Sequence, residues 1–145
     1  HNSDFAPGFI GLLGNPHALG QAVHIMSPES MTWNQIYEVV ANALGVKLNA
    51  VHISTDFLAA AGGGKYDFTG SLTGDKSNSV VFDISKLKRL VPGFAPVKSM
   101  EQGLRETVQN VLAHPELHRE DPEFDSWCDR VIEARQKALD SLQQG

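Results

Sequence analysis

Residues 83–108 read DISKLKRLVPGFAPVKSMEQGLRETV, and this stretch contains clear helix start and stop signals. Asp83 is a favourable helix N-cap and predicts a short helix that ends before the Pro-Gly turn at 92–93. Ser99 and Gln102 then have the spacing of a capping box. The apolar residues that follow recur at helical spacing and predict an amphipathic helix up to about His114.

The same signals predict three further helices on either side of this stretch. Asp4 is expected to cap a first helix over residues 5–13. Thr32 and Gln35 form a second capping box, which opens a helix that Gly45 ends. Asp121, followed by proline and glutamate, predicts the start of a long C-terminal helix with an apolar stripe from Phe124 to Leu142.

Short apolar runs between these helices indicate strands at residues 22–26, 51–53 and 80–82. So few and such short strands cannot close a large sheet. They either extend a sheet formed by other residues or make a very small one. We therefore expect a small, helix-rich α/β domain with a long C-terminal helix.

The glycine-rich region 62–78 shows no convincing periodicity and is expected to be a loop that could order around a ligand. Its Gly-Gly-Gly-Lys run at 62–65 superficially resembles a phosphate-binding loop. However, that motif needs spaced glycines and a Ser or Thr after the lysine, and Tyr66 stands there instead. We interpret the region as a flexible loop.

Composition excludes several classes of protein. The chain has 145 residues, of which 41% are hydrophobic. This balance is typical of one globular domain with a core. The net charge of -5 and the scattered basic residues argue against nucleic-acid binding. No apolar run approaches the length of a membrane span, so we expect no membrane insertion. A chain that starts with His1 rather than Met is expected to be a piece of a longer protein.

The single cysteine, Cys128, allows no internal disulfide, and a cytoplasmic location is the natural expectation. Cys128 lies on the apolar stripe of the last helix, between Asp125 and Asp129. Neighbouring carboxylates disfavour a thiolate, so we expect a core residue rather than a nucleophile. Among the six histidines only His114 and His118 have the i, i+4 spacing of a metal site, and Pro115 separates them, so no metal site is predicted.

Three segments resemble the C-terminal half of the extended short-chain dehydrogenases, the family of NAD-dependent epimerases and dehydratases. Residues 1–6 (HNSDFA) are similar to the family's His-Val-x-Asp-x-Ala segment. Residues 20–25 (GQAVHI) resemble its Gly-x-x-Tyr-Asn-Ile strand. Residues 83–108 follow its closing pattern most closely, and the match as a whole spans about residues 1–112.

The resemblance implies a Rossmann-type parent whose N-terminal part binds NAD or NADP and carries a Tyr-x-x-x-Lys pair. Neither that pair nor the glycine fingerprint occurs here, so no catalytic residue is expected in this chain. The implied organisation is a substrate-binding part over residues 1–115 and a helical extension over 116–145. The expected partners are a small-molecule substrate and a second copy of the chain in a homodimer.

The family's substrate marker, Arg-x-Gly-Asp, corresponds to residues 72–75, where Leu72 replaces the arginine that clamps a nucleotide-sugar diphosphate. Lys76 could supply the positive charge instead, without the bidentate geometry of arginine. We therefore expect Asp75, Lys76 and Asn78 to contact the substrate, with His1 as a weaker cofactor contact. The alternative is that Asp75 caps a turn and Lys76 is only solvated.

Two functions of different classes follow. The first is the substrate-binding portion of an NAD(P)-dependent epimerase, dehydratase or reductase that acts on a sugar nucleotide or another small hydroxylated or carbonyl substrate. The second is a noncatalytic relative that serves in regulation or RNA binding, because a fold does not fix a function. A third role, assembly through the C-terminal helix, is also open.

Overall fold

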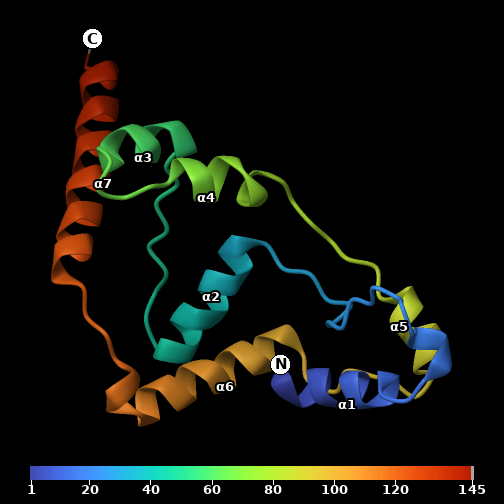
Figure 1. Ribbon diagram of the computed structural model, residues 1–145. Coiled ribbons are helices and arrows are strands. Elements are labelled where there is room, and N and C mark those ends of the chain that lie inside the picture. Colours follow the sequence, from blue (N-terminus) through green and yellow to red (C-terminus); the bar gives the residue numbers. More distant parts are fainter. Residues whose placement is uncertain (145) are drawn as a thin grey trace. The chain divides into compact units, whose positions relative to one another are not determined.

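The structure is a computed structural model, and it describes residues 1–144 except the side chain of Asp75. The helices of the first part of the chain are α1 (Asn2–Leu12), η1 (Pro16–Ala18), α2 (Trp33–Leu44), α3 (Thr55–Gly62) and α4 (Thr69–Thr73) (Figure 1). They are followed by η2 (Asp75–Ser77), α5 (Ser85–Leu90), α6 (Met100–Ala113), η3 (Pro115–Leu117) and α7 (Pro122–Gln143).

The α/β prediction is wrong. Over the described residues 1–144 the protein is helical, with neither strand nor sheet. The three predicted strands, at 22–26, 51–53 and 80–82, are single extended segments without a ladder partner. An extended segment becomes a strand only when a neighbouring backbone pairs with it, which the alternation of apolar residues cannot guarantee.

The helix ends follow the sequence signals closely. At the start of α2, Gln35 N–H donates to the Thr32 hydroxyl over 3.3 Å, and the Gln35 side chain accepts from Thr32 N–H over 2.8 Å. The predicted capping box is therefore confirmed in both directions. Gly45 ends α2 with a φ of 71°. This left-handed conformation favours glycine.

The other capping predictions are confirmed in part. Ser99 caps α6 by accepting from Gln102 N–H, and Asp121 caps α7 by accepting from Phe124 N–H. Asp83 lies one residue before the N-cap of α5, where its carboxylate accepts from both the backbone N–H and the hydroxyl of Ser85. The helix α4 was not predicted, because its five residues are too few to show a period.

The chain divides into two compact units. The first comprises His1–Leu48 and Val80–Leu117, and the second comprises Asn49–Ser79 and the chain from His118 onward. The predicted division at residues 115 and 116 describes the family resemblance and stays a prediction.

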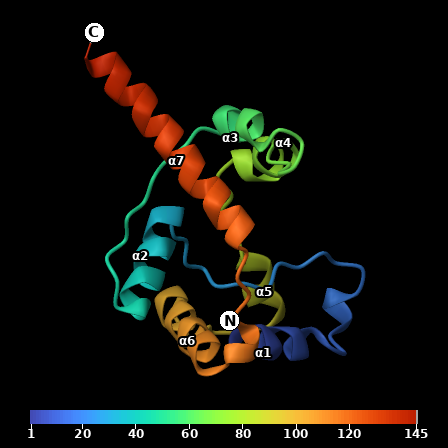
Figure 2. The same ribbon diagram turned by 90° about the vertical axis from the view of Figure 1, so that its left-hand side faces the viewer.

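The first unit contains the small hydrophobic core of Ile84, Leu87 and Phe94. Val23, Ile25 and Met26 from the extended segment pack against this core, which explains why the segment is apolar without being a strand. Within this unit α1 contacts α5, and α2 lies beside α6 in both views (Figures 1 and 2). Two aromatic side chains of α2 lie outside its buried face, since Trp33 is 66% exposed and Tyr37 is 54% exposed.

The second unit is organised around Trp127 of α7. Its ring lies 4.8 Å from Tyr66 and stacks on Phe68 and Phe124 at 5.4 and 5.7 Å between ring centroids. The indole N–H donates to the carbonyl of Ala61 at the end of α3 over 3.3 Å. Figure 2 shows α3 and α4 side by side in this unit. None of the helices in residues 1–144 is both long and apolar enough to cross a membrane.

Candidate functional site

The first element of the candidate site is the imidazole of His1, which caps α1. The backbone N–H of Ser3 donates to His1 Nδ1 over 3.2 Å, and the Ser3 hydroxyl lies 2.8 Å from the same nitrogen. A nitrogen that accepts from a backbone N–H carries no proton of its own. The ring is therefore held as the tautomer with its proton on Nε2.

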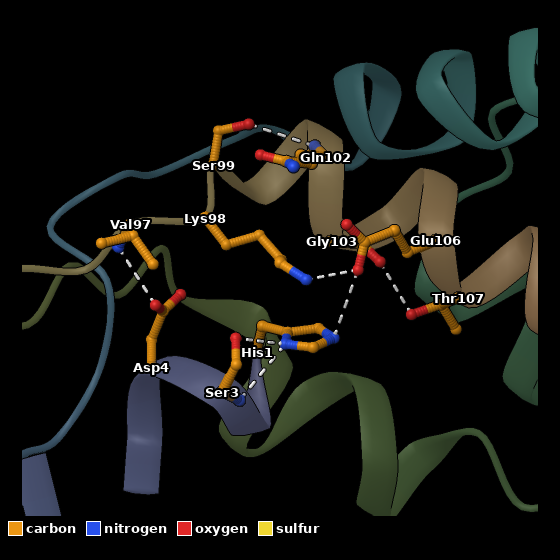
Figure 3. A network of polar contacts seen from close by, with 10 residues as sticks. All are labelled: His1, Ser3, Asp4, Val97, Lys98, Ser99, Gln102, Gly103, Glu106 and Thr107. Atoms are coloured by element: carbon orange, nitrogen blue, oxygen red, sulfur yellow. Dashed lines mark hydrogen bonds and ion pairs between the residues drawn. The ribbon is translucent and has the colours of Figure 1, made fainter. Parts of the chain in front are cut away.

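Glu106 of α6 connects His1 to Lys98. Its Oε2 atom lies 3.8 Å from His1 Nε2 and forms an ion pair with the ammonium of Lys98 (Figure 3). The Lys98 side chain is only 18% exposed, so this pair is partly shielded from water. One carboxylate thus compensates the charge of Lys98 and lies close to the imidazole of His1.

Asp4 is the one residue among those described that is both charged and buried, with 8% of its surface exposed. It was predicted to cap the first helix, but it lies inside α1, where His1 takes the capping role. Its Oδ1 atom instead accepts from the backbone N–H of Val97 over 3.0 Å. Figure 3 shows this bond, which ties α1 to the segment that leads into α6.

His1 lines at least two cavities, and both are formed by residues of the first unit. The larger, about 340 Å³, is lined by His1, Asn2, Asp4, Phe5, Ile25, Met26, Ser27 and Phe94. The smaller, about 240 Å³, is lined by His1, Ser27, Lys98, Ser99, Met100, Gly103, Leu104 and Thr107. His1 and Ser27 are common to the two.

The segment that carries Ser27 is held at the N-terminus of α6. Glu29 accepts a hydrogen bond from the backbone N–H of Met100 over 2.6 Å. This bond satisfies a free donor of the first helical turn. Glu29 N–H in turn donates to the Ser27 hydroxyl over 3.2 Å. These bonds fix the position of Ser27 between the two cavities.

The predicted substrate contacts lie in the second unit. Lys76 is exposed on η2, and Asn78 follows closely, with its amide donating to the Ser77 hydroxyl over 3.1 Å. The side chain of Asp75 lies outside what the structure describes. The roles of Asp75, Lys76 and Asn78 in binding a substrate stay predictions, as does the cofactor contact of His1.

Sequence reasoning missed Asp4, Ser27, Lys98 and Glu106 as candidate site residues. The position of Asp4 before an apolar helix is the usual signature of an N-cap, and it conceals a contact with a distant segment. Lys98 and Glu106 are isolated charged residues in the sequence, and such residues are usually exposed at the surface. Their pairing beside His1 arises only because α6 lies next to the start of α1.

The prediction of a disfavoured thiolate at Cys128 is confirmed, whereas the side chain is only half-buried and does not belong to the hydrophobic core. Burial, first, and then the carboxylates of Asp125 and Asp129 raise the pKa of its thiol above the ordinary value. A raised pKa keeps the thiol protonated and poorly nucleophilic at neutral pH. In the part of the chain that the structure describes, no three His, Cys, Asp or Glu side chains gather closely enough to hold a metal ion.

The chain is similar to the 2'-dehydrokanamycin reductase of Streptomyces kanamyceticus, with 30% identity over 94 residues. The aligned part is 65% of this chain and 26% of the reductase, so the chain matches about a quarter of the length of that relative. No sequence profile of a known family matches the chain. No solved structure matches it either.

These comparisons make the chain a distant relative of a reductase. The predicted Rossmann-type α/β architecture is not present in the described residues.

Proposed function

We propose that this chain is the substrate-binding portion of an NAD(P)-dependent oxidoreductase that acts on a small hydroxylated or carbonyl substrate. The observation that carries the proposal is the 30% identity to a reductase. The cavities beside His1 support it, because they combine apolar walls with a few polar groups, as small-molecule sites do. An NAD-dependent epimerase or dehydratase is the more specific form of the same proposal.

The cavities beside His1 do not fit a whole nicotinamide dinucleotide. The larger one is about 340 Å³, and Asp4 is one of its lining residues. The carboxylate of Asp4 repels a diphosphate. We therefore propose that NAD or NADP is held mainly by residues outside this chain, with His1 as one contact. Bound nicotinamide supplies the hydride in such enzymes. The residues described here bind and orient the substrate.

Lys76 and Asn78 are proposed to contact an anionic or polar part of the substrate, together with Asp75. Lys76 is exposed and on a short helical turn, so its ammonium is accessible to a ligand. A hydrogen bond from a charged donor contributes about 1.5–3 kcal/mol. Loss of that donor therefore weakens binding roughly tenfold to a hundredfold.

The test is nicotinamide oxidation by the intact protein with a panel of carbonyl compounds, including keto forms of free sugars and of nucleotide sugars. Turnover of NADH or NADPH with one of them is the expected result. If neither nicotinamide is oxidised with any of them, the oxidoreductase proposal fails and the noncatalytic alternative takes its place. Binding of RNA or of a regulatory partner then becomes the property to measure.

The role of Lys76 is tested separately with Lys76→Ala and the matched control Lys47→Ala, which removes another exposed lysine. We expect a raised KM for Lys76→Ala, a kcat that changes little, and no effect of the control. An unchanged KM for a verified substrate would remove Lys76 from the site.

A homodimer through α7 is a second proposal, favoured by the apolar surface that this helix leaves exposed. Phe124 and Trp127 are used inside the second unit, but Leu142 is 79% exposed and Ile132 and Leu139 are partly exposed. Light scattering of the chain and of the double variant Leu139→Glu and Leu142→Glu decides the matter. An identical mass for the two proteins contradicts a dimer built on this face.

A further inference from the structure

We propose that the larger cavity beside His1 binds an amine-bearing, hydroxylated ring of the amino-sugar class, with the carboxylate of Asp4 as its anchor. This inference rests on the proposed function in one respect, since it specifies the chemical class of the substrate. It concerns binding alone and does not depend on hydride transfer.

Asp4 is a buried carboxylate whose hydrogen bonding is incomplete. Its Oδ1 atom accepts from Val97 N–H, whereas its other oxygen has no hydrogen-bond donor among the described residues (Figure 3). No buried side-chain oxygen of the described residues lacks a hydrogen-bond partner, so this second oxygen of Asp4 is accessible to solvent. Since Asp4 lines the cavity, a ligand in the cavity could supply the missing donor.

The charges around the cavity favour a cationic ligand over an anionic one. The positive charge of Lys98 is compensated by the carboxylate of Glu106. Asp4 is the carboxylate among the lining residues of the cavity, and it attracts an ammonium group and repels a phosphate.

The other lining residues suit a ring with one polar edge and one apolar face. Phe5, Ile25 and Phe94 give the cavity an apolar wall, against which the C–H face of a sugar ring packs. Asn2 and Ser27 present an amide and a hydroxyl at the same cavity, where they can bond the ring hydroxyls.

The size of the cavity restricts the ligand further. Its volume is about 340 Å³. This value is near the lower limit for small-molecule sites, which begin at about 300 Å³. One ring therefore fits the cavity, whereas a complete nucleotide sugar does not.

The experiment is a calorimetric titration of the full chain, without nicotinamide, with two matched sugars. Glucosamine carries an ammonium group, and N-acetylglucosamine carries a neutral amide at the same carbon. We expect glucosamine to bind at least about tenfold more tightly, because the hydrogen bond to the carboxylate is charge-assisted. Glucose 6-phosphate serves as the anionic probe and is expected not to bind.

Asp4→Asn is the decisive variant. Its amide oxygen still accepts from Val97 N–H, so the link between α1 and the segment before α6 is kept while the charge is removed. We expect Asp4→Asn to bind glucosamine and N-acetylglucosamine with about the same affinity. Glu38→Gln, which removes an exposed carboxylate from α2 in the same unit, is the control and should leave the preference unchanged.

Asn2→Phe tests the location independently of charge and of the buried Asp4. Asn2 is exposed at the cavity, so a large ring there obstructs the entrance without disturbing the core. We expect it to weaken binding of glucosamine at least about tenfold with unchanged circular dichroism. Equal binding of the two sugars by the unmodified chain, or glucosamine binding that survives both variants, would overturn the proposal.

The outcome is distinguishable from that of the proposed function. Nicotinamide turnover by the intact protein combined with no preference for glucosamine rejects the amino-sugar site alone. A charge-dependent preference without any turnover rejects the oxidoreductase proposal alone.

Discussion

The Oδ1 atom of Asp4 accepts a hydrogen bond from the backbone N–H of Val97, 3.0 Å away and 93 positions along the chain. It joins the first turn of α1 to the segment that leads into α6. Because Asp4 is also a wall of the larger cavity, the same carboxylate has a structural bond on one oxygen and is open to a ligand at the other.

The first prediction concerns the structural side of this bond. Asp4→Ala leaves the Val97 N–H without its partner and is expected to lower the free energy of unfolding by about 1–3 kcal/mol. Asp4→Asn keeps an acceptor for the Val97 N–H, so its free energy of unfolding is expected to fall by less. Urea unfolding followed by circular dichroism measures both. Equal stability of Asp4→Ala and the surface control Glu38→Ala would contradict the importance of the bond.

The second prediction concerns the close approach of α1 to the core at Gly8. A Cβ atom added there would lie 2.8 Å from Ile25 Cγ2 and 3.0 Å from the ring of Phe94. Gly8→Ala gains about 1 kcal/mol of helix propensity, but overpacking against the buried ring costs about 1–3 kcal/mol. We expect a net loss of stability in thermal or urea unfolding.

Gly103 provides the matched control for Gly8. It also lies inside a helix, but the atoms closest to an added Cβ belong to His1 at 3.7 and 3.8 Å, which is ordinary contact. Gly103→Ala is therefore expected to be neutral or to gain up to about 1 kcal/mol. If Gly8→Ala is as stable as Gly103→Ala, the close packing of α1 against Ile25 and Phe94 is contradicted.

The third prediction is a pH dependence from Asp83. Hydrogen bonds from the hydroxyl and then the backbone N–H of Ser85 lower the pKa of its carboxyl. A group whose pKa is lower in the folded state stabilises the fold above its ordinary pKa and loses that effect as the pH falls through the folded value. Asp83→Ala should therefore reduce stability at neutral pH, and the difference should shrink below about pH 4.

Ser85→Ala checks the cause of this pH dependence, since it removes the hydroxyl donor and keeps the backbone N–H. We expect it to abolish most of the acid-dependent loss of stability that Asp83 contributes. Urea midpoints measured across the acidic range for the three proteins give the answer. Parallel pH profiles for all three would show that Ser85 does not stabilise the ionised carboxylate.

The fourth prediction concerns Cys128. Burial and the carboxylates of Asp125 and Asp129 raise the pKa of its thiol, so folding disfavours the thiolate. Iodoacetamide should therefore alkylate the folded chain several-fold more slowly than the urea-unfolded chain near pH 8. Because the pKa is raised, the neutral thiol is favoured by folding, and stability falls as the pH rises past the ordinary thiol pKa. Equal rates for the folded and unfolded chains would contradict the prediction.

The local features of the fold could be predicted from the sequence because they depend on residues within one helical turn. Thr32 with Gln35, Ser99 with Gln102, and Asp121 before Pro122 each place a side-chain acceptor beside free backbone N–H groups of the same segment. Nothing distant is needed, and each of these helices begins where its capping signal stands.

The strands and the candidate site could not be predicted in the same way. Val23, Ile25 and Met26 are apolar because they cover Ile84, Leu87 and Phe94, and not because a neighbouring strand pairs with them. Alternating apolar residues record that one side of a segment is buried, but they do not record what buries it.

By itself, then, the sequence determined the starts of α2, α6 and α7, and through Asp125 and Asp129 it determined part of the raised pKa of the Cys128 thiol. The largest cause of that raised pKa is burial, which the tertiary structure decides. The tertiary structure alone decided that the extended segments remain unpaired and that Asp4, Ser27, Lys98 and Glu106 gather around His1. The physical reason is that a cap or a carboxylate one helical turn away acts at a distance fixed by covalent geometry. A buried carboxylate that meets a backbone N–H 93 positions away acts only where the folded chain brings the two together.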